Sequence, residues 1–218
     1  MPTPTNENYL KVLHYLHQEN PAISISDLSK EMEVSKPTAN DMAKKLQAQG
    51  WVLYKKYKPL QLTEEGRRMA SLVIRKHRLA EMFLHRIMGF GWEEVHEMAE
   101  EIEHLKSEKL FDRMDELLGF PTVDPHGSNI PDRDGNFITH NYIQLSQIKE
   151  GQKVVLRALK DSSTDFLGFL DKKEILLGLE ITVLEIEPYD KSIKVSYGNF
   201  SKAVLTHSIS KRLLVELD

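Results

Sequence analysis

Apolar residues in the first fifty positions recur with the spacing of short helices. Four of them between residues 6 and 20 stand at i, i+3, i+4 and i+7, which predicts a helix that stops before Pro21. These four residues are Tyr9, Val12, Leu13 and Leu16. Ser24 or Ser26 is placed to cap a second helix, whose expected inner face carries Leu28 and Met32.

A third helix and a short hairpin are predicted directly after these two helices. Ser35 is placed as the N-cap of the helix, Pro37 lies in its first turn, and Gly50 ends it. Its expected buried stripe is Ala39, Met42, Ala43 and Leu46. Residues 51–54 and 60–62 then read as two strands around a basic turn. This order of elements is the winged helix-turn-helix pattern.

Residues 64–118 are again helical in pattern, with two apolar stripes. The first stripe is Leu79, Met82, Phe83 and Ile87. The second stripe is Val95, Ala99, Ile102 and Leu105, on what we expect to be one long helix that runs to Leu118. The N-terminal unit does not need both stripes for its own core, so we expect at least one to serve subunit contact.

Beyond Phe120 the pattern changes from helix to loop and then to strand. Residues 120–140 are rich in Pro, Gly, Asp and Asn, which indicates a loop-rich linker. Five short runs rich in Val, Ile and Leu follow, and five strands in about 75 residues predict a small barrel. These runs are residues 153–159, 180–186, 192–197, 203–205 and 213–215.

Composition and charge narrow the class of protein further. The chain has 218 residues, 40% of them hydrophobic, which is typical of a globular protein. Zero Cys excludes disulfides, thiol catalysis and zinc fingers. No apolar run reaches the roughly 20 residues of a membrane helix, and the first residues lack a signal-peptide pattern. We therefore expect a cytoplasmic protein that does not bind membranes.

The net charge of -4 is unevenly distributed along the chain. Residues 1–70 carry +2, residues 71–140 carry -6 and residues 141–218 carry 0. A mildly basic winged unit suits contact with phosphates, because Lys and Arg neutralise them. The alternative is a solvated helix face used for protein contacts. The candidate DNA-binding residues are Ser35, Lys36, Pro37, Thr38, Asn40, Lys44, Lys55, Lys56 and Lys58.

The acidic segment contains histidines at helical spacing from carboxylates. His96, Glu100, Glu103 and His104 stand at i, i+4, i+7 and i+8, on an arc distinct from that of the apolar stripe. His77 and Glu81 repeat the i, i+4 spacing on the preceding helix. Imidazole and carboxylate donors that converge from one side suit a divalent cation. A Glu-rich surface with incidental His explains the same spacing, so the pattern alone leaves both interpretations open.

Several motifs together resemble the diphtheria-toxin-repressor family of metal-dependent transcriptional regulators. The resemblance covers essentially the whole chain, including a C-terminal barrel like that of the longer members. The motifs are residues 75–81, 95–97, Glu100, Glu103, His104, residues 35–38, 62–66, 125–127 and 130–131. The resemblance implies a dimeric repressor that binds palindromic operator DNA when loaded with Mn(II) or Fe(II), and no enzyme or small-molecule substrate.

The resemblance also implies two metal sites. Its primary site falls on Asn8, Glu100, Glu103 and His104. Its ancillary site falls on His77, Glu81 and His96, with Asp165 as the best-placed candidate from the barrel. Ser162 stands where iron-type members supply a barrel carboxylate, which is a departure from their pattern.

Glu100 matches one type of implied relative, whereas Asn8 and Lys11 depart from the pattern. Iron-type members have Cys at the position of Glu100 and Met at that of Asn8, whereas manganese-type members have Glu and Asp. Glu100 therefore favours Mn(II), with Fe(II) next, because an oxygen and imidazole shell suits a harder ion. Other divalent transition metals are expected to bind in vitro. Lys11 replaces a Glu that serves a paired metal site in some short members, which argues against such a pair.

The sequence thus predicts an α+β protein of three domains. These are a winged helix-turn-helix (1–66), a helical dimerisation and metal-binding domain with a loop-rich linker (67–140) and an SH3-like, ferrous-transport-A-like β-barrel (141–218). Two other functions were weighed. One is a metal-independent winged-helix interaction module, and the other is a metal-dependent hydrolase, for which no separate base or substrate pocket is visible.

Overall fold

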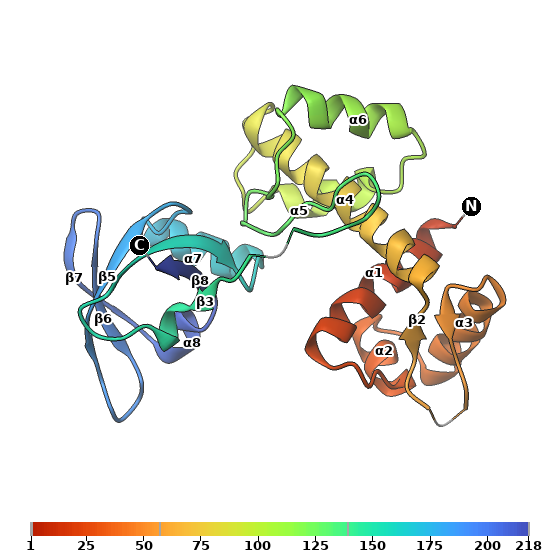
Figure 1. The fold of residues 1–218 in the computed structure, drawn as a ribbon, viewed down its shortest axis with the longest axis horizontal. Coiled ribbons are helices and arrows are strands. Elements are labelled where there is room, and N and C mark those ends of the chain that lie inside the picture. Colours follow the sequence, from red (N-terminus) through yellow and green to blue (C-terminus); the bar gives the residue numbers. More distant parts are fainter. Residues whose placement is uncertain (1, 57, 139, 218) are drawn as a thin grey trace. The chain divides into compact units, whose positions relative to one another are not determined.

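The computed structural model describes residues 2–56, 58–138 and 140–217, in two compact units (Figure 1). The first unit comprises the chain up to Ala80 with Ala99–Phe120 and Ile130–Phe137. The second comprises Glu81–Met98, Pro121–Asn129 and the chain from Ile138 onward. This division cuts two continuous helices and differs from the three domains predicted from sequence, which stay a prediction.

Three helices form the N-terminal head of the first unit. They are α1 (Pro4–Glu19), α2 (Ile25–Glu31) and α3 (Lys36–Ala48). Ser24 caps α2 in a reciprocal pair with Asp27, and the Ser35 side chain accepts from the Thr38 amide at the start of α3. Gly50 follows α3 with a φ of 78°, a conformation that glycine adopts without strain. The predicted caps and helix ends are confirmed.

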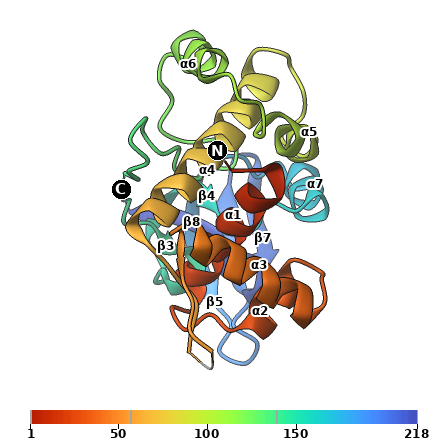
Figure 2. The same cartoon turned by 90° about the vertical axis from the view of Figure 1, so that its right-hand side faces the viewer.

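A two-stranded hairpin completes the head as its wing. Strands β1 (Val52–Leu53) and β2 (Gln61–Leu62) pair antiparallel. Figure 2 shows the three helices of the head at the front, with the loop between β1 and β2 extending downward from them. The core that joins these elements is apolar. Its fully buried large side chains are Leu10, Leu13, Ile23, Leu28, Leu46 and Leu60.

The segment after the wing contains three helices where two were predicted. They are α4 (Glu64–Arg86), α5 (Val95–Ile102) and α6 (Glu108–Leu117). The single long helix expected up to Leu118 is therefore wrong. Ser107 occupies the N-cap position of α6, so the backbone turns between Ile102 and Glu108, and Leu105 is 46% exposed instead of buried. Ile87 of the first expected stripe is also exposed, just beyond the end of α4.

The second unit contains a six-stranded antiparallel sheet. Its order is β3-β8-β4-β5-β6-β7. The strands are β3 (Ile143–Gln144), β4 (Lys153–Leu159), β5 (Glu180–Ile186), β6 (Ile193–Tyr197), β7 (Phe200–Leu205) and β8 (Leu213–Leu217). Irregularities in three of the strand pairings interrupt the register, and such bulges bend and twist a sheet. Figure 1 shows the resulting curvature. The five predicted strands are present, with β3 added.

Alternate residues of the strands build the core of this sheet. Val154 and Leu156 of β4 and Ile181 and Val183 of β5 point inward with the two-residue period of a strand. A short 3₁₀ turn, η1 (Leu145–Gln147), and helices α7 (Thr164–Lys172) and α8 (His207–Ser210) lie along this part of the chain. Trp92 belongs to the same core, and its indole N–H donates to the Asp171 carboxylate of α7 at 2.9 Å.

None of the helices in the described residues is both long and apolar enough to cross a membrane.

We expect Leu28→Ala to destabilise the head by about 2–5 kcal/mol, because it removes a fully buried side chain and leaves a cavity. Urea denaturation followed by circular dichroism measures this change. Leu53→Ala is the matched control, since Leu53 is 58% exposed and its truncation leaves no cavity. Equal losses in the two variants would contradict the assignment of Leu28 to the core.

Candidate metal centre

A buried carboxylate lies at the centre of the candidate site in the first unit. Glu103 stands just beyond the end of α5 and is 0% exposed. The Lys11 ammonium of α1 donates to both of its oxygens, at 2.7 and 2.9 Å. His77 Nδ1 of α4 lies 2.7 Å from Glu103 Oε2, and His104 Nε2 lies 3.6 Å from Oε1. Glu103 thus brings together side chains from three separate segments.

The charges around Glu103 keep it ionised inside the protein. Burial by itself raises the pKa of a carboxyl group, because it penalises the charged form. The hydrogen bond from His77 and the charge of Lys11 outweigh this effect and hold the pKa of Glu103 below its usual value. The site therefore offers a negative, oxygen-donor group of the kind that hard divalent cations prefer.

Helix α1 carries two further side chains with oxygen donors, and one of them contacts the residue that follows Glu103. Glu7 is buried, and its Oε2 lies 2.6 Å from Nδ1 of His104. Asn8 lies next to it, and its Oδ1 is buried with no hydrogen-bond partner among the described residues. A buried amide oxygen without a partner is costly, and a cation would satisfy it. Asn8, Glu103 and His104 thus supply the amide, carboxylate and imidazole donors that a divalent cation uses.

Glu100 sits at the solvent side of the same cluster. Its side chain is 53% exposed, and its Oε1 lies 3.7 Å from Lys11 Nζ. The four residues predicted for the primary site thus lie on two segments of the first unit. Lys11 and Glu7, which were not predicted as ligands, contact two of these four residues. The sequence pattern missed Glu7, because a single carboxylate on α1 has no distinctive spacing. Lys11, predicted to disfavour a paired metal site, places its ammonium on the carboxylates themselves.

The residues predicted for the ancillary site belong to a different set of contacts. His77 and Glu81 lie four residues apart on α4, on the same face of the helix. In the second unit, Glu81 is buried and its Oε1 lies 3.2 Å from Nδ1 of His96. His96 therefore contacts Glu81, as the predicted ancillary site requires.

Glu81 also belongs to a fully buried group that the sequence pattern did not single out. Glu81, Asp124 and His126 each offer a ligand atom within 4.8 Å of one another. His126 Nε2 lies 2.9 Å from the Trp92 carbonyl, so in the neutral ring this nitrogen donates and Nδ1 carries the lone pair. Nδ1 lies 3.9 Å from Glu81 Oε2. A histidine oriented in this way by a backbone carbonyl is prepared to bind a metal.

The motif at residues 125–127 was the available signal for this group. In the sequence, this motif belongs to the family pattern and assigns no role to His126. Asp165, the predicted barrel ligand, is exposed in the first turn of α7 and belongs to neither candidate metal group. Its role as a ligand stays a prediction.

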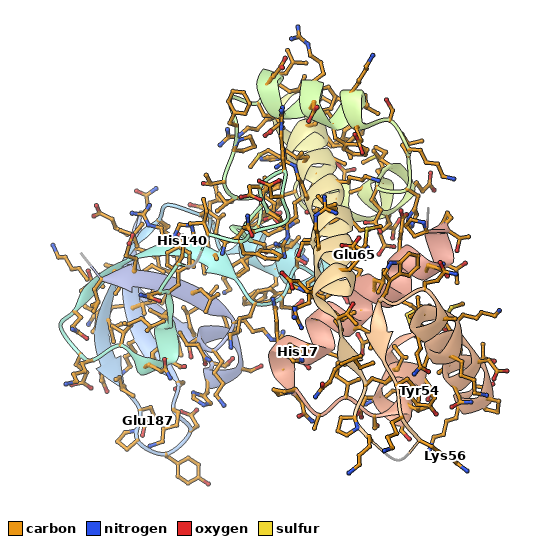
Figure 3. All side chains as sticks on the ribbon, turned by 45° about the vertical axis from the view of Figure 1, so that its right-hand side comes forward. His17, Tyr54, Lys56, Glu65, His140 and Glu187 are labelled. Atoms are coloured by element: carbon orange, nitrogen blue, oxygen red, sulfur yellow. The ribbon has the colours of Figure 1, made fainter. Side chains whose placement is uncertain are left out.

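The predicted DNA-binding residues lie on α3, at its start and on the wing. Lys44 of α3 is exposed and pairs with Asp41 at 3.1 Å. The Tyr54 hydroxyl of the wing donates to Asn40 of α3, which ties the two elements together. A cavity of about 710 Å³ lies between these elements, and its wall includes Lys36, Pro37, Lys56 and Lys58. Figure 3 shows Tyr54 and Lys56 on the wing, with Lys56 at its outer end.

Three segments of the chain match models of known protein families. Residues 1–60 match the family "Iron dependent repressor, N-terminal DNA binding domain" and residues 63–132 match "Iron dependent repressor, metal binding and dimerisation domain". Residues 143–217 match the FeoA domain.

Individual relatives agree with these matches. The iron-dependent repressor IdeR of Mycobacterium leprae is 29% identical over 97% of this chain and 96% of its own length. The transcriptional regulator MntR of Geobacillus kaustophilus is 32% identical over 55% of this chain and 84% of its own. A solved manganese-dependent transcriptional repressor in complex with manganese is 32% identical, with a TM-score of 0.87, covering 98% of this chain and 100% of that one.

Acidification should weaken the packing of α1 through His14. Its ring stacks on Phe137 at 5.2 Å, and burial, with the charges of Arg78 and His17, lowers its pKa from 6.5 to about 4. The unfolded chain therefore binds a proton at His14 before the folded chain does. The stability from the neutral ring is full above pH 6.5 and is lost as the pH falls towards 4.

We expect the free energy of unfolding of His14→Gln to fall less steeply than that of the wild type between pH 6.5 and 4. Urea titrations at several pH values, with chelator present, measure the two slopes. His17→Gln serves for comparison and should change the slope less, because His17 is exposed on the same helix (Figure 3) and is the smallest of the three causes of the lowered pKa of His14. A wild-type slope in His14→Gln would show that His14 titrates normally.

Proposed function

Because the chain belongs to the iron-dependent repressor family, the family of the diphtheria toxin repressor, it is a metal-dependent DNA-binding repressor, and we propose that Mn(II) or Fe(II) activates it. The observation that carries this proposal is the Glu103 cluster. It joins the helix α1 of the DNA-binding head to the segment after α5. We place this activity in the cytoplasm, where the DNA is.

Asn8, Glu100, Glu103 and His104 would hold the activating ion. Their support is the buried Asn8 Oδ1 without a partner, the ionised Glu103 and the imidazole of His104. The bound ion supplies positive charge shared between α1 and the segment of Glu100 to His104. Asn8 on α1 would then hold the head against this segment. Since an ion that binds the DNA-competent arrangement better must favour DNA binding, metal and DNA affinities are coupled reciprocally.

The DNA would be a palindromic operator bound by a homodimer. Two-fold symmetric proteins read two half-sites at a spacing fixed by the dimer. The match to a dimerisation domain at residues 63–132 supports the dimer. Ser35, Lys36, Pro37, Thr38, Asn40 and Lys44 of α3 would face the major groove, with Lys55, Lys56 and Lys58 of the wing near phosphates.

Manganese is the first expectation among the metals, and ferrous iron is the second. The cluster offers carboxylate, amide and imidazole donors without a sulfur atom, and such ligands suit harder ions. The relatives include both iron-dependent and manganese-dependent regulators, so they do not choose between the two ions.

A second ion would bind around Glu81. Two sets of ligands include this carboxylate. The sequence predicts His77, Glu81 and His96, with Asp165 as a further candidate. The geometry of the second unit favours Glu81, Asp124 and His126. The second set is better supported, because all three residues are buried and Trp92 orients His126.

The other two functions weighed from sequence receive less support. A metal-independent interaction module does not account for the match of residues 63–132 to a metal binding and dimerisation domain. A hydrolase needs an ion that substrate can reach, whereas Glu103 is 0% exposed, and the family is one of transcriptional repressors.

DNA affinity of the wild type should rise when Mn(II) is added, and Glu103→Ala should lose this rise. Coupling of about 1–3 kcal/mol corresponds to a change of about 5–150-fold in affinity. Fluorescence anisotropy with palindromic DNA, with Mn(II), Fe(II), Zn(II) or chelator, measures it. Glu101→Ala is the matched control, since Glu101 is an exposed carboxylate two residues away. Equal metal dependence in Glu103→Ala and the wild type would refute the proposed function.

Replacement of Glu100 by Cys should shift activation from Mn(II) towards Fe(II) and other softer ions. Glu100 is a half-exposed carboxylate, and a thiolate in its place prefers softer metals. The measurement is the metal concentration for half-maximal DNA binding, compared for both ions in both proteins. Identical Mn(II) to Fe(II) ratios would show that Glu100 does not set the preference.

A further inference from the structure

The contacts of Lys11 point to a role that the metal ligands do not share. Lys11 is 8% exposed, and its Nζ lies 2.7 and 2.9 Å from the two oxygens of Glu103 and 3.7 Å from Glu100. A lysine ammonium has no lone pair, so it does not ligate a metal. It supplies a positive charge from the protein itself, at the carboxylates that a metal ion would use.

The same side of α1 makes two other contacts within the first unit. Glu7, Lys11 and His14 stand at i, i+4 and i+7, which places them along one face of the helix. Glu7 bonds His104, Lys11 bonds Glu103, and the His14 ring stacks on Phe137. The neighbouring face of α1 packs into the head, through Tyr9, Leu10 and Leu13. Helix α1 therefore has protein contacts on both sides, and Lys11 lies in the middle of the row that faces Glu103.

We propose that Lys11 is a built-in cation that ties α1 to Glu103 in the metal-free protein, so that the head is partly positioned for DNA before metal binds. Buried ions are stable only when they are paired, and removal of one partner leaves the other charge uncompensated. The pair therefore resists separation of α1 from Glu103. Lys11 is a positioning residue in this role, because it acts on DNA affinity through α1 and makes no ligand bond.

This proposal rests on the proposed function, and it adds a statement about the metal-free state. If Lys11 positions α1, its loss lowers DNA affinity mainly without metal, since Asn8, Glu100, Glu103 and His104 hold α1 once the ion is bound. The ratio of metal-loaded to metal-free DNA affinity then increases. If Lys11 only stabilises the fold, its loss lowers the melting temperature and leaves this ratio unchanged.

The experiment compares the wild type, Lys11→Met and Lys11→Gln, each with chelator and with saturating Mn(II). DNA affinity is measured by anisotropy, and hydrogen exchange follows the amides of α1. Met keeps the apolar stem of the side chain, and Gln keeps a hydrogen-bond donor without the charge. Lys194→Met is the control, because it removes an exposed ammonium that pairs with Glu185 at 2.7 Å.

Without metal, we expect both Lys11 variants to bind DNA about 5-fold or more weakly than the wild type, which is the lower end of typical allosteric coupling. With Mn(II) bound, we expect their DNA affinity to fall by less than about 2-fold. The amides of α1 should exchange faster in the metal-free variants than in the metal-free wild type. An unchanged ratio of metal-loaded to metal-free DNA affinity overturns the role of Lys11, whether or not the exchange of α1 changes. If metal does not change the DNA affinity of the wild type, the proposed function is refuted instead. If Lys11→Met does not fold, Lys11→Gln decides between these outcomes.

Discussion

The need to neutralise one buried carboxylate organises the first unit of this protein. Glu103 has no contact with water, and an ionised carboxylate in that position is stable only among cations and hydrogen-bond donors. Lys11 and His77 meet this need, and they come from α1 and α4. The carboxylate thus fixes how three segments distant in the sequence meet. This dependence on charge is the reason for the proposal that a divalent cation binds at this cluster.

The position of α1 connects this cluster to DNA recognition. Tyr9, Leu10 and Leu13 of α1 belong to the core of the head, which also contains Leu46 of α3. A helix packed into that core transmits its own position to α3 and to the wing, because close-packed interiors are not freely deformable. The contacts of Glu7, Lys11 and His14 therefore act on the recognition surface without touching it. Repression that depends on metal needs this kind of link between the ion and the DNA.

In the second unit, Trp92 links the core of the sheet to the buried group of Glu81, Asp124 and His126. Trp92 precedes α5 in the chain and packs among the strands, while its carbonyl orients His126. The backbone amides of His126 and Ser128 donate to Asp124 Oδ1, which stabilises the loop around the buried group. Gly127 has a φ of 83°, and a Cβ there would lie 2.2 Å from the Arg157 carbonyl, so the loop passes this strand too closely for any other residue. Glu81 is thereby held among groups that suit a cation.

The sequence by itself determined the elements of local origin. Helix caps at Ser24 and Ser35, the end of α3 at Gly50, the wing and the five strands follow from periodicity and turn chemistry, which depend on near neighbours. The motifs also indicated the family and most residues of the candidate metal centre. Only the tertiary structure decided which of these residues meet.

Lys11 contacts Glu103 and Glu7 contacts His104, and the spacing of residues along the chain reveals neither partner. The physical reason is that a charge pair between α1 and Glu103 spans 92 positions of the chain, and no local pattern encodes such a distance.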